Sequence, residues 1–241
     1  MDILKKIRDK QNDNKNSGIT VCFFGDSVTQ GCFEVFRPEP DRLQSIFDKS
    51  SAYHKYFADI FTVLCPSVPV NVINAGVSGA RASLSLGLID DLVLKNNPDL
   101  VVVCFGLNDA NDGLEKINVY KEALTEIFRK IKAIGAEIIF MTPNMLCNSV
   151  SPHIKDDLIK SVAESSALCQ QSGVFDKYMD AAREVCIKES VIICDCYKKW
   201  KRMAECGINI TELLANKINH PTRQMNWLFA YSLVETIFNT D

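Results

Sequence analysis

The stretch ITVCFFGDSVTQG, Ile19 to Gly31, joins an apolar run to a short polar loop that begins with Gly-Asp-Ser. A β-branched and aromatic run of this length predicts a buried strand. The loop places the hydroxyl of Ser27 directly after that strand, where the backbone has to turn. A loop of this kind can hold a phosphate group, cap a helix or present a nucleophile, and the remaining sequence has to distinguish these roles.

Four further apolar runs alternate with longer helical patterns. The five predicted strands cover residues 19–24, 68–74, 99–105, 136–142 and 190–195. Helices are predicted over residues 43–64, 82–95, 114–134, 155–188 (one helix, or two broken near Gly173) and 221–238. This alternation predicts parallel strands joined by right-handed crossovers, with helices on both faces of the sheet. We therefore expect an α/β fold, a three-layer α/β/α sandwich, forming one domain over residues 1–241 with an N-terminal helix or tail over residues 1–17.

The composition is ordinary for a globular protein, with 47% hydrophobic residues, 24% charged residues and a formal net charge of -3. Nucleic-acid binding usually requires a basic surface, which this balance does not suggest. No apolar run approaches the ~20 residues that a membrane-spanning helix needs. The charged N-terminus also lacks the pattern of a secretory signal. We expect a cytoplasmic protein without nucleic-acid or membrane partners, and the sequence predicts no particular oligomeric state.

The ten cysteines are scattered and form no Cys-x-x-Cys pair. Free cysteine in an apolar strand behaves as a small hydrophobic residue. For the pair in Cys194-Asp195-Cys196 we expect the two thiols to face different ways and not to share a metal ion. We therefore expect buried, reduced thiols in place of a disulfide framework or a zinc site.

Polar, glycine-bearing loops follow the first three predicted strands. Loops that follow parallel strands gather beyond the carboxyl ends of the sheet. At that edge Ser27 is a candidate nucleophile, and Gly79 and Asn108 are candidate hydrogen-bond donors to an oxyanion. Considered singly, Gly79 is also typical of a turn and Asn108 of an Asx turn or a helix cap. The appearance of all three after consecutive strands favours a catalytic site.

A serine nucleophile needs a base, and the chain has three histidines. His54 lies inside a predicted helix, and His153 lies beside a loop. His220 directly precedes Pro221, and proline is favoured in the first turn of a helix. We therefore expect His220 at a loop-to-helix junction after the last strand, from which it can reach the edge that carries Ser27.

The same blocks of sequence resemble the SGNH hydrolases, also called the GDSL-like lipase/acylhydrolase family. The resemblance rests on Gly25-Asp26-Ser27, Asn74-x-x-x-x-Gly79, Gly106-Leu107-Asn108-Asp109 and His220-Pro221. It implies a flavodoxin-like SGNH hydrolase fold, with Ser27 as nucleophile and His220 as base. It also implies an oxyanion hole formed by the backbone N–H groups of Ser27 and Gly79 and by the Asn108 side chain. Neither a metal nor an organic cofactor is implied.

One position departs from the family pattern. An aspartate usually lies three residues before the histidine, and this chain has Lys217 there. A lysine side chain cannot accept a hydrogen bond from the imidazole, so we expect it to point to solvent. A backbone carbonyl, Asn216 or an acid from elsewhere would then hold the second ring nitrogen, and Asn216 is the named candidate.

The leading hypothesis is a serine esterase that cleaves a small or carbohydrate-linked acyl ester, with acetyl as one candidate acyl group. An acyltransferase with the same site is an alternative, and so is a catalytically weak relative that binds ligands. A phosphate- or nucleotide-binding module is disfavoured because the G-x-x-x-x-G-K-[ST] pattern is absent. The segment from Cys32 to Phe57 is expected either to wall a pocket or simply to connect the first strand to the long helix.

Overall fold

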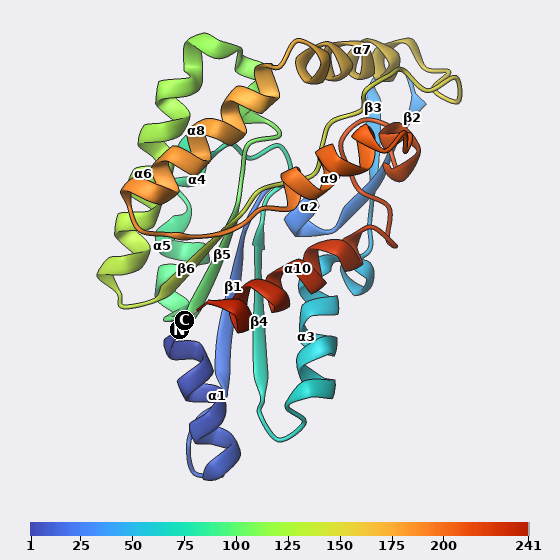
Figure 1. Cartoon of the computed structure of the whole chain (residues 1–241). Coiled ribbons are helices and arrows are strands. Elements are labelled where there is room, and N and C mark those ends of the chain that lie inside the picture. The colour runs from blue at the N-terminus through green and yellow to red at the C-terminus, as the bar shows by residue number, and fades with distance from the viewer. Residues whose placement is uncertain (241) are drawn as a thin grey trace.

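The computed structural model describes residues 1–240 and contains a parallel sheet between two layers of helices (Figure 1). All five predicted strands are confirmed: β1 (Ile19–Gly25), β4 (Val70–Gly76), β5 (Leu100–Cys104), β6 (Glu137–Met141) and β7 (Ile192–Cys194). Their order is β4-β1-β5-β6-β7, and every neighbouring pair is parallel. The chain moves from β1 outward to β4 and then returns across β1 to β5. This reversal places a binding crevice beyond the carboxyl ends of β1 and β5.

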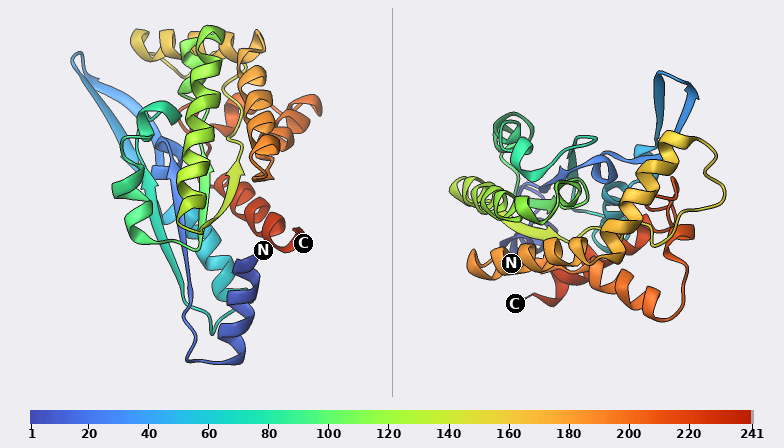
Figure 2. Two further views of the ribbon diagram at one scale, coloured as in Figure 1. Left: turned by 90° about the vertical axis from the view of Figure 1, so that its left-hand side faces the viewer. Right: turned by 90° about the horizontal axis from the view of Figure 1, so that it is seen from above.

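Helices cover both faces of the sheet (Figure 2). On one face, α3 (Tyr53–Leu64) packs against α10 (Asn226–Asn239). The opposite layer contains α4 (Ala82–Ser85), α5 (Ile89–Leu92), α6 (Ile117–Ala133) and α8 (Val174–Lys188). Because both faces are covered, every residue of β5 is buried.

The remaining elements flank this sandwich. They are α1 (Asp2–Asn12), α2 (Ser27–Gln30), β2 (Cys32–Glu39), β3 (Arg42–Phe47), α7 (Asp157–Gln171) and α9 (Cys196–Glu205). Short 3₁₀ turns cover Lys49–Ser51, Leu94–Asn96, Asp109–Asp112, Leu114–Lys116 and Ile210–Leu213. The break predicted near Gly173 is confirmed, because Gly173 separates α7 from α8 in a left-handed conformation.

The predicted helix over residues 43–64 is wrong in nearly its first half, residues 43–52. Residues 32–47 instead form an antiparallel hairpin of β2 and β3, and the helix begins only at Tyr53. Pro38 and Pro40 lie at the tip of this hairpin, where proline favours a turn and opposes a helix. The hairpin projects from the carboxyl edge of the sheet, beside α7 (Figure 1). The connection after β1 therefore forms a wall near the predicted site.

Two other helices differ from prediction. The segment 82–95 is divided into α4 and α5, followed by a 3₁₀ turn, with Gly87 between the two helices. The last helix begins at Asn226 and not at Pro221, because Pro221 still pairs with Leu214 in an isolated β-bridge. Helix α9 was not predicted.

All ten cysteines are free, and eight of them are buried. The expectation that Cys194 and Cys196 face opposite ways is wrong, since their Sγ atoms lie 3.8 Å apart. Strand β7 ends at Cys194 and α9 begins at Cys196, so the chain turns at Asp195 between them, and even in a continuous strand two residues at positions i and i+2 would share a face.

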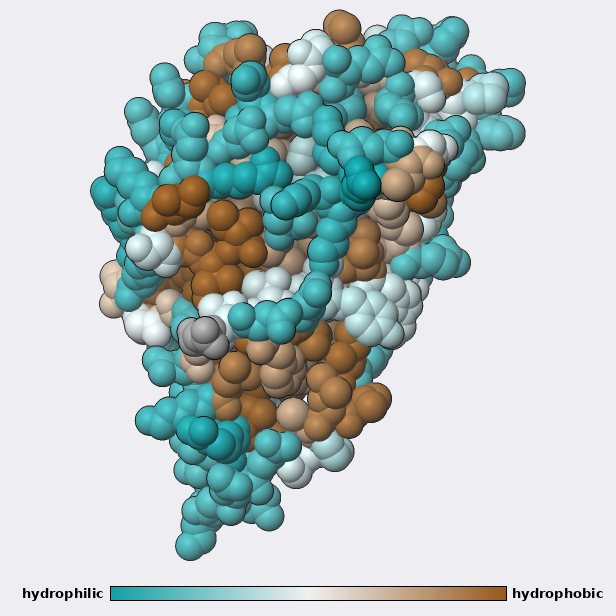
Figure 3. Space-filling model, in the orientation of Figure 1, coloured by the Kyte–Doolittle hydropathy of each residue, from teal (hydrophilic) through white to brown (hydrophobic). Residues whose placement is uncertain are grey.

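The end of the molecule opposite the hairpin is formed partly by α1. Polar side chains cover this end, and an apolar surface lies beside it over the lower end of α3 (Figure 3). Val63 and Leu64, at the end of α3, are exposed. Within residues 1–240, no helix has the length and apolar character needed to cross a bilayer.

Candidate active site

Ser27 lies at the first position of α2, immediately beyond β1. Asp26 caps this helical turn, because its side chain accepts a hydrogen bond from the Val28 N–H at 2.9 Å. Gly25 allows the turn to sit close to the sheet, since a Cβ there would lie 2.6 Å from the carbonyl oxygen of Cys104. The Gly-Asp-Ser sequence thus forms a sharp strand-to-helix turn that presents the serine at the sheet edge.

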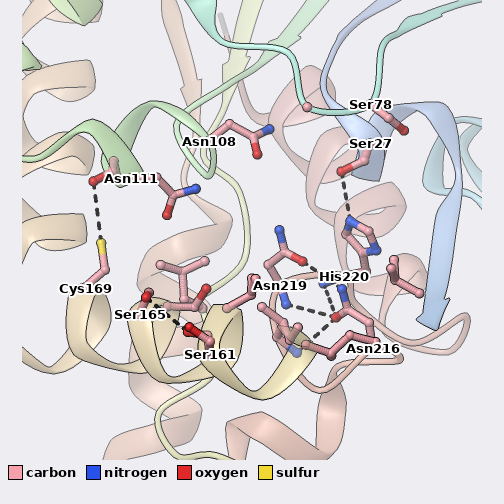
Figure 4. A pocket seen from close by; sticks show the side chains of 18 of the residues that line it. Ser27, Ser78, Asn108, Asn111, Ser161, Ser165, Cys169, Asn216, Asn219 and His220 are labelled. Atoms are coloured by element: carbon pink, nitrogen blue, oxygen red, sulfur yellow. Dashed lines mark hydrogen bonds between the residues drawn. The ribbon is translucent and has the colours of Figure 1, made fainter. Parts of the chain in front are cut away.

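The structure brings His220 to Ser27 across 193 positions of sequence. The Oγ of Ser27 lies 2.9 Å from Nε2 of His220, and both residues are buried (Figure 4). The other two histidines are not at the site: His54 is buried in α3, and His153 is exposed in a loop. The predicted meeting of these two side chains at the sheet edge is therefore present in the structure.

The second ring nitrogen of His220 contacts the backbone carbonyl of Phe33 at 3.1 Å. A carbonyl oxygen can only accept, so Nδ1 must carry the proton that it donates. In the neutral ring Nε2 is then unprotonated and can accept the Ser27 hydroxyl proton. The hydrogen bond to Phe33 thus selects the tautomer that a general base requires.

The prediction that Asn216 orients the ring is wrong, because Phe33 occupies that position. The Asn216 Oδ1 instead accepts backbone N–H groups of Ile218, Asn219 and His220, each at 3.0 Å. An Asx side chain commonly closes a turn in this way. Asn216 therefore shapes the loop that carries His220 without touching the imidazole.

Lys217 points away from the imidazole. Its backbone is left-handed, with φ of 61°, and its ammonium lies 2.8 Å from the Glu212 carboxylate. This chain has no aspartate at this position, and the Phe33 carbonyl, not Lys217, orients the imidazole.

An ionic cluster around Arg223 anchors the strand that carries the Phe33 carbonyl. Arg223 donates two hydrogen bonds to Glu34, at 2.6 and 3.1 Å, and one to Asp48 at 3.0 Å. The Arg223 guanidinium also lies 4.3 Å from the centre of the Phe33 ring. Bidentate arginine–carboxylate pairs fix both distance and orientation. Because Arg223 follows His220 by three residues, the cluster joins the histidine loop to the strand that supplies the carbonyl.

Ser27 and Gly79 line the same cavity, and the backbone N–H group of each can serve as a donor there. The Ser27 N–H lies in the first turn of α2, where a helix provides no internal acceptor. Gly79 has φ of 74°, a conformation that favours glycine, and a Cβ there would meet nothing within 4 Å. Its N–H has no acceptor among residues 1–240. These groups are therefore available to a ligand.

Asn108 lies on the opposite side of the same space, with its amide directed toward Ser27 (Figure 4). Its Nδ2 donates to the carbonyl of Ala80 at 3.0 Å and lies 3.5 Å from Oδ2 of Asp26. The first contact is a normal hydrogen bond and the second is at the limit of one. Nδ2 carries two protons. One forms the hydrogen bond to the Ala80 carbonyl and so links the two loops, while the other makes only the long contact with Asp26.

Burial shifts the pKa values of three titratable groups here. It lowers the pKa of His220 to about 4, because the charged imidazolium is poorly solvated. It raises the pKa of Asp26 to about 7 and that of Asp109 to about 6. The His220 ring is therefore neutral at pH 7 and can act as a base.

All five predicted site residues line one cavity of about 840 Å³. Much of its remaining wall comes from α7, with further residues from the β2–β3 hairpin. The sequence predicted neither the α7 wall nor the role of Phe33. A backbone carbonyl carries no residue-type signal, and the contribution of α7 depends on packing between segments far apart in sequence.

Comparisons with known proteins identify the family and the fold. The sequence pattern of the GDSL-like Lipase/Acylhydrolase family matches residues 23–228. An acetylxylan esterase from Geobacillus stearothermophilus is 24% identical over 136 residues, 53% of this chain and 60% of that protein. The match therefore spans less than two thirds of that relative.

Solved structures share the fold. The crystal structure of an acetyl xylan esterase has a TM-score of 0.67 at 18% identity, over 91% of this chain and 100% of that chain. An alpha/beta hydrolase enzyme from the metagenome of Lake Arreo, Spain, has a TM-score of 0.67 at 18% identity, over 91% and 95%. Each of these proteins contains the parallel sheet and flanking helices described above.

Proposed function

The chain belongs to the GDSL-like lipase/acylhydrolase family of carboxylic ester hydrolases, and we propose that Ser27 is its nucleophile and His220 its general base. The observation that carries this assignment is the 2.9 Å contact between Ser27 Oγ and an imidazole whose other nitrogen donates to Phe33. A serine hydroxyl becomes a useful nucleophile only with such a base beside it.

In the proposed reaction, Nε2 of His220 takes the Ser27 proton as Oγ attacks the ester carbonyl. The resulting imidazolium returns the proton to the leaving alcohol, and an acyl-serine forms. Water then attacks this intermediate with the same base, and the acid is released. The Phe33 carbonyl holds Nδ1–H throughout, so the ring keeps its orientation while its charge changes.

The oxyanion of each tetrahedral intermediate would be bound by three donors. They are the backbone N–H groups of Ser27 and Gly79 and the weakly engaged Nδ2 proton of Asn108. The free Gly79 N–H and the direction of the Asn108 amide support this assignment. Donors fixed before the reaction stabilise developing charge with little reorganisation.

The names of the relatives support an acetyl ester of an oligosaccharide as the first substrate to assay. The test compares hydrolysis of p-nitrophenyl acetate and acetylated xylooligosaccharides by the wild-type, Ser27→Ala and His220→Ala proteins. We expect each substitution to lower kcat by at least ~1,000-fold, because the two side chains act as one unit. Products should also be analysed with added alcohol, since alcohol esters would identify a transferase.

Ser78→Ala is the matched control. Ser78 lines the same cavity, but its hydroxyl donates to Gln30 at 2.7 Å and lies outside the proposed mechanism. Turnover by Ser27→Ala equal to that of Ser78→Ala would reject the assignment of the nucleophile.

A further inference from the structure

The cavity extends well beyond the Ser27–His220 pair. It runs along α7 toward Asn111 and Cys169, which lie at the far side from Ser27 in Figure 4. Its volume of about 840 Å³ is within the range of sites that enclose a drug-sized ligand. An acetyl group would fill only the end beside Ser27.

Nine aliphatic side chains, interspersed with serine and asparagine, line the wall away from the reacting atoms. They are Val35, Leu43, Leu146, Leu158, Ile159, Val162, Leu168, Val174 and Ile218. Among residues 1–240, no charged side chain and no phenylalanine, tyrosine or tryptophan lines the cavity. The wall therefore lacks the aromatic faces and ionic groups that would orient a sugar or a charged acyl group.

Some of these aliphatic groups have no protein partner to cover them. Leu158 and Val162 on α7 are 46% and 49% exposed, and Leu43 on the hairpin is 57% exposed. All three border the cavity. Hydrocarbon that enters the cavity would remove this apolar surface from water, which is favourable.

Several polar groups in the wall are already engaged within the protein. The hydroxyls of Ser165 and Ser172 donate to helix carbonyls of Ser161 and Cys169, at 3.1 and 3.3 Å. The Asn216 amide is used by its own loop and by Asn219. A sugar placed along α7 would lose hydrogen bonds to water without gaining equivalent partners from these groups.

We infer that this cavity is an acyl-chain site and that the substrate is an ester of an uncharged aliphatic acid of intermediate length. The inference rests on the proposed function. The α7 residues that line the cavity run from Leu158 to Cys169, about 16 Å of helix, which leaves room for an extended chain of roughly eight to ten carbons once its carbonyl lies beside Ser27. The acyl carbonyl lies beside Ser27, and the hydrocarbon lies along α7.

The test is the chain-length dependence of kcat/KM. It uses p-nitrophenyl esters from acetyl to decanoyl, below their micellar concentrations, with acetylated xylooligosaccharides in parallel. We expect kcat/KM to rise about three- to fourfold per methylene until the cavity is filled. The hexanoyl or octanoyl ester should therefore exceed the acetyl ester by at least about tenfold.

Two variants localise the effect to α7. Val162→Trp fills the middle of the wall and should lower the octanoyl-to-acetyl ratio of kcat/KM by about tenfold. Leu158→Gln removes apolar surface without adding volume and should lower the same ratio. Glu164→Trp is the matched control, because Glu164 is an exposed α7 residue that does not line the cavity. Its ratio should equal that of the wild type.

The two hypotheses fail in different ways. The acyl-chain site would be overturned if kcat/KM fell with each methylene beyond acetyl. It would also be overturned if acetylated xylooligosaccharides were hydrolysed as well as the hexanoyl ester. Neither result would contradict Ser27 as the nucleophile of an esterase. An equal change of the ratio in Val162→Trp and Glu164→Trp would also overturn the acyl-chain site. If no ester is cleaved and Ser27 is inert to a fluorophosphonate, the proposed function itself is rejected.

Discussion

At the scale of single residues, the site replaces a carboxylate with a peptide carbonyl. The Phe33 oxygen fixes the His220 tautomer as an aspartate would, but it brings no negative charge to stabilise the imidazolium. Burial therefore governs the ionisation of the ring, and it holds the pKa of His220 down to about 4.

The pH profile follows from this shift. The ring must be neutral to accept the Ser27 proton, and lowering its pKa extends the neutral form to more acid pH. We expect kcat/KM to stay level as pH falls toward about 5 and then to decline through about 4. The measurement covers about pH 3 to 5.5, below the pKa values of about 7 and about 6 to which burial raises Asp26 and Asp109, with circular dichroism to confirm folding at each pH. A steady fall of about tenfold per pH unit across this whole range, as an imidazole of ordinary pKa would give, would contradict this account.

Asn108→Ala tests the side-chain donor to the oxyanion. Loss of one such donor costs about 100- to 1,000-fold in kcat in serine hydrolases, with little effect on KM. We expect a decrease in that range, measured with p-nitrophenyl esters. Asn118→Ala on the exposed surface of α6 is the control, and equal activity of the two variants would remove Asn108 from the mechanism.

At the scale of elements, the β2–β3 hairpin contacts the loop that carries His220 and so helps to place His220 beside Ser27. Its first strand supplies the Phe33 carbonyl, and Glu34 on the same strand binds Arg223 from the segment that precedes α10. A second ion pair, Arg37 with Asp156 at 2.8 Å, joins the hairpin to the N-cap of α7. The hairpin thus helps to position the base and to enclose the cavity.

Glu34→Gln tests this positioning role. It weakens the bidentate pair with Arg223 and removes a negative charge that favours the imidazolium. We expect kcat to fall by roughly tenfold with KM unchanged, because the Phe33 peptide is held less tightly. The acid limb of the pH profile should also move to lower pH, which a purely structural defect would not cause.

Lys217→Ala is the matched control for that experiment. It also breaks an ion pair, the one with Glu212, but that pair points away from the ring. We expect its kcat and pH profile to match the wild type. If Lys217→Ala lowered kcat as much as Glu34→Gln does, the effect of Glu34→Gln would reflect general disruption of the loops and not a specific effect on His220.

The elements also show where sequence reasoning succeeds. The inner strands β1, β5 and β6 are nearly continuous apolar runs, because both faces of the sheet are covered there, so their positions could be predicted. The edge strand β4 alternates aliphatic residues with asparagine, a pattern that also indicates a strand. Residues 32–52 could not be assigned correctly, because their aromatic and aliphatic residues suit either a hairpin or a helix. The choice depends on contacts with α7 and with Arg223, more than 100 positions away.

The site was predictable where side chains carry the chemistry. Ser27 and His220 have residue types and loop positions that indicate acyl transfer, and their contact is present. A backbone carbonyl was among the candidates for the orienting group, but Phe33 could not be named because any residue can supply a carbonyl. Asn216 was a reasonable candidate by residue type, but its oxygen is used by three backbone N–H groups of its own loop.

At the scale of the whole molecule, helix α1 and the candidate site lie at opposite ends of the sheet. Helix α1 packs below the amino ends of the strands, with Ile3 and Ile7 buried and its first N–H groups bound by Glu137 (Figure 1). The site lies beyond the carboxyl ends. Changes in α1 should therefore affect the free energy of unfolding without affecting turnover.

Ile7→Ala makes that separation measurable. Truncating a buried isoleucine costs about 2–4 kcal/mol of the free energy of unfolding, which urea denaturation would detect. We expect kcat/KM to remain at the wild-type value while the variant is folded. Lys5→Ala, on the exposed side of the same helix, should change neither quantity. Loss of activity without loss of stability would show coupling between the two ends.

The most direct test of the account is the reaction of Ser27 with a fluorophosphonate, located by peptide mass spectrometry on the folded protein. Attack at phosphorus needs the activated hydroxyl and the donors around it, but no knowledge of the natural ester. The account predicts one phosphonyl group, on Ser27, in the wild type and almost none in His220→Ala. An unmodified Ser27, or equal labelling with and without the imidazole, would contradict it.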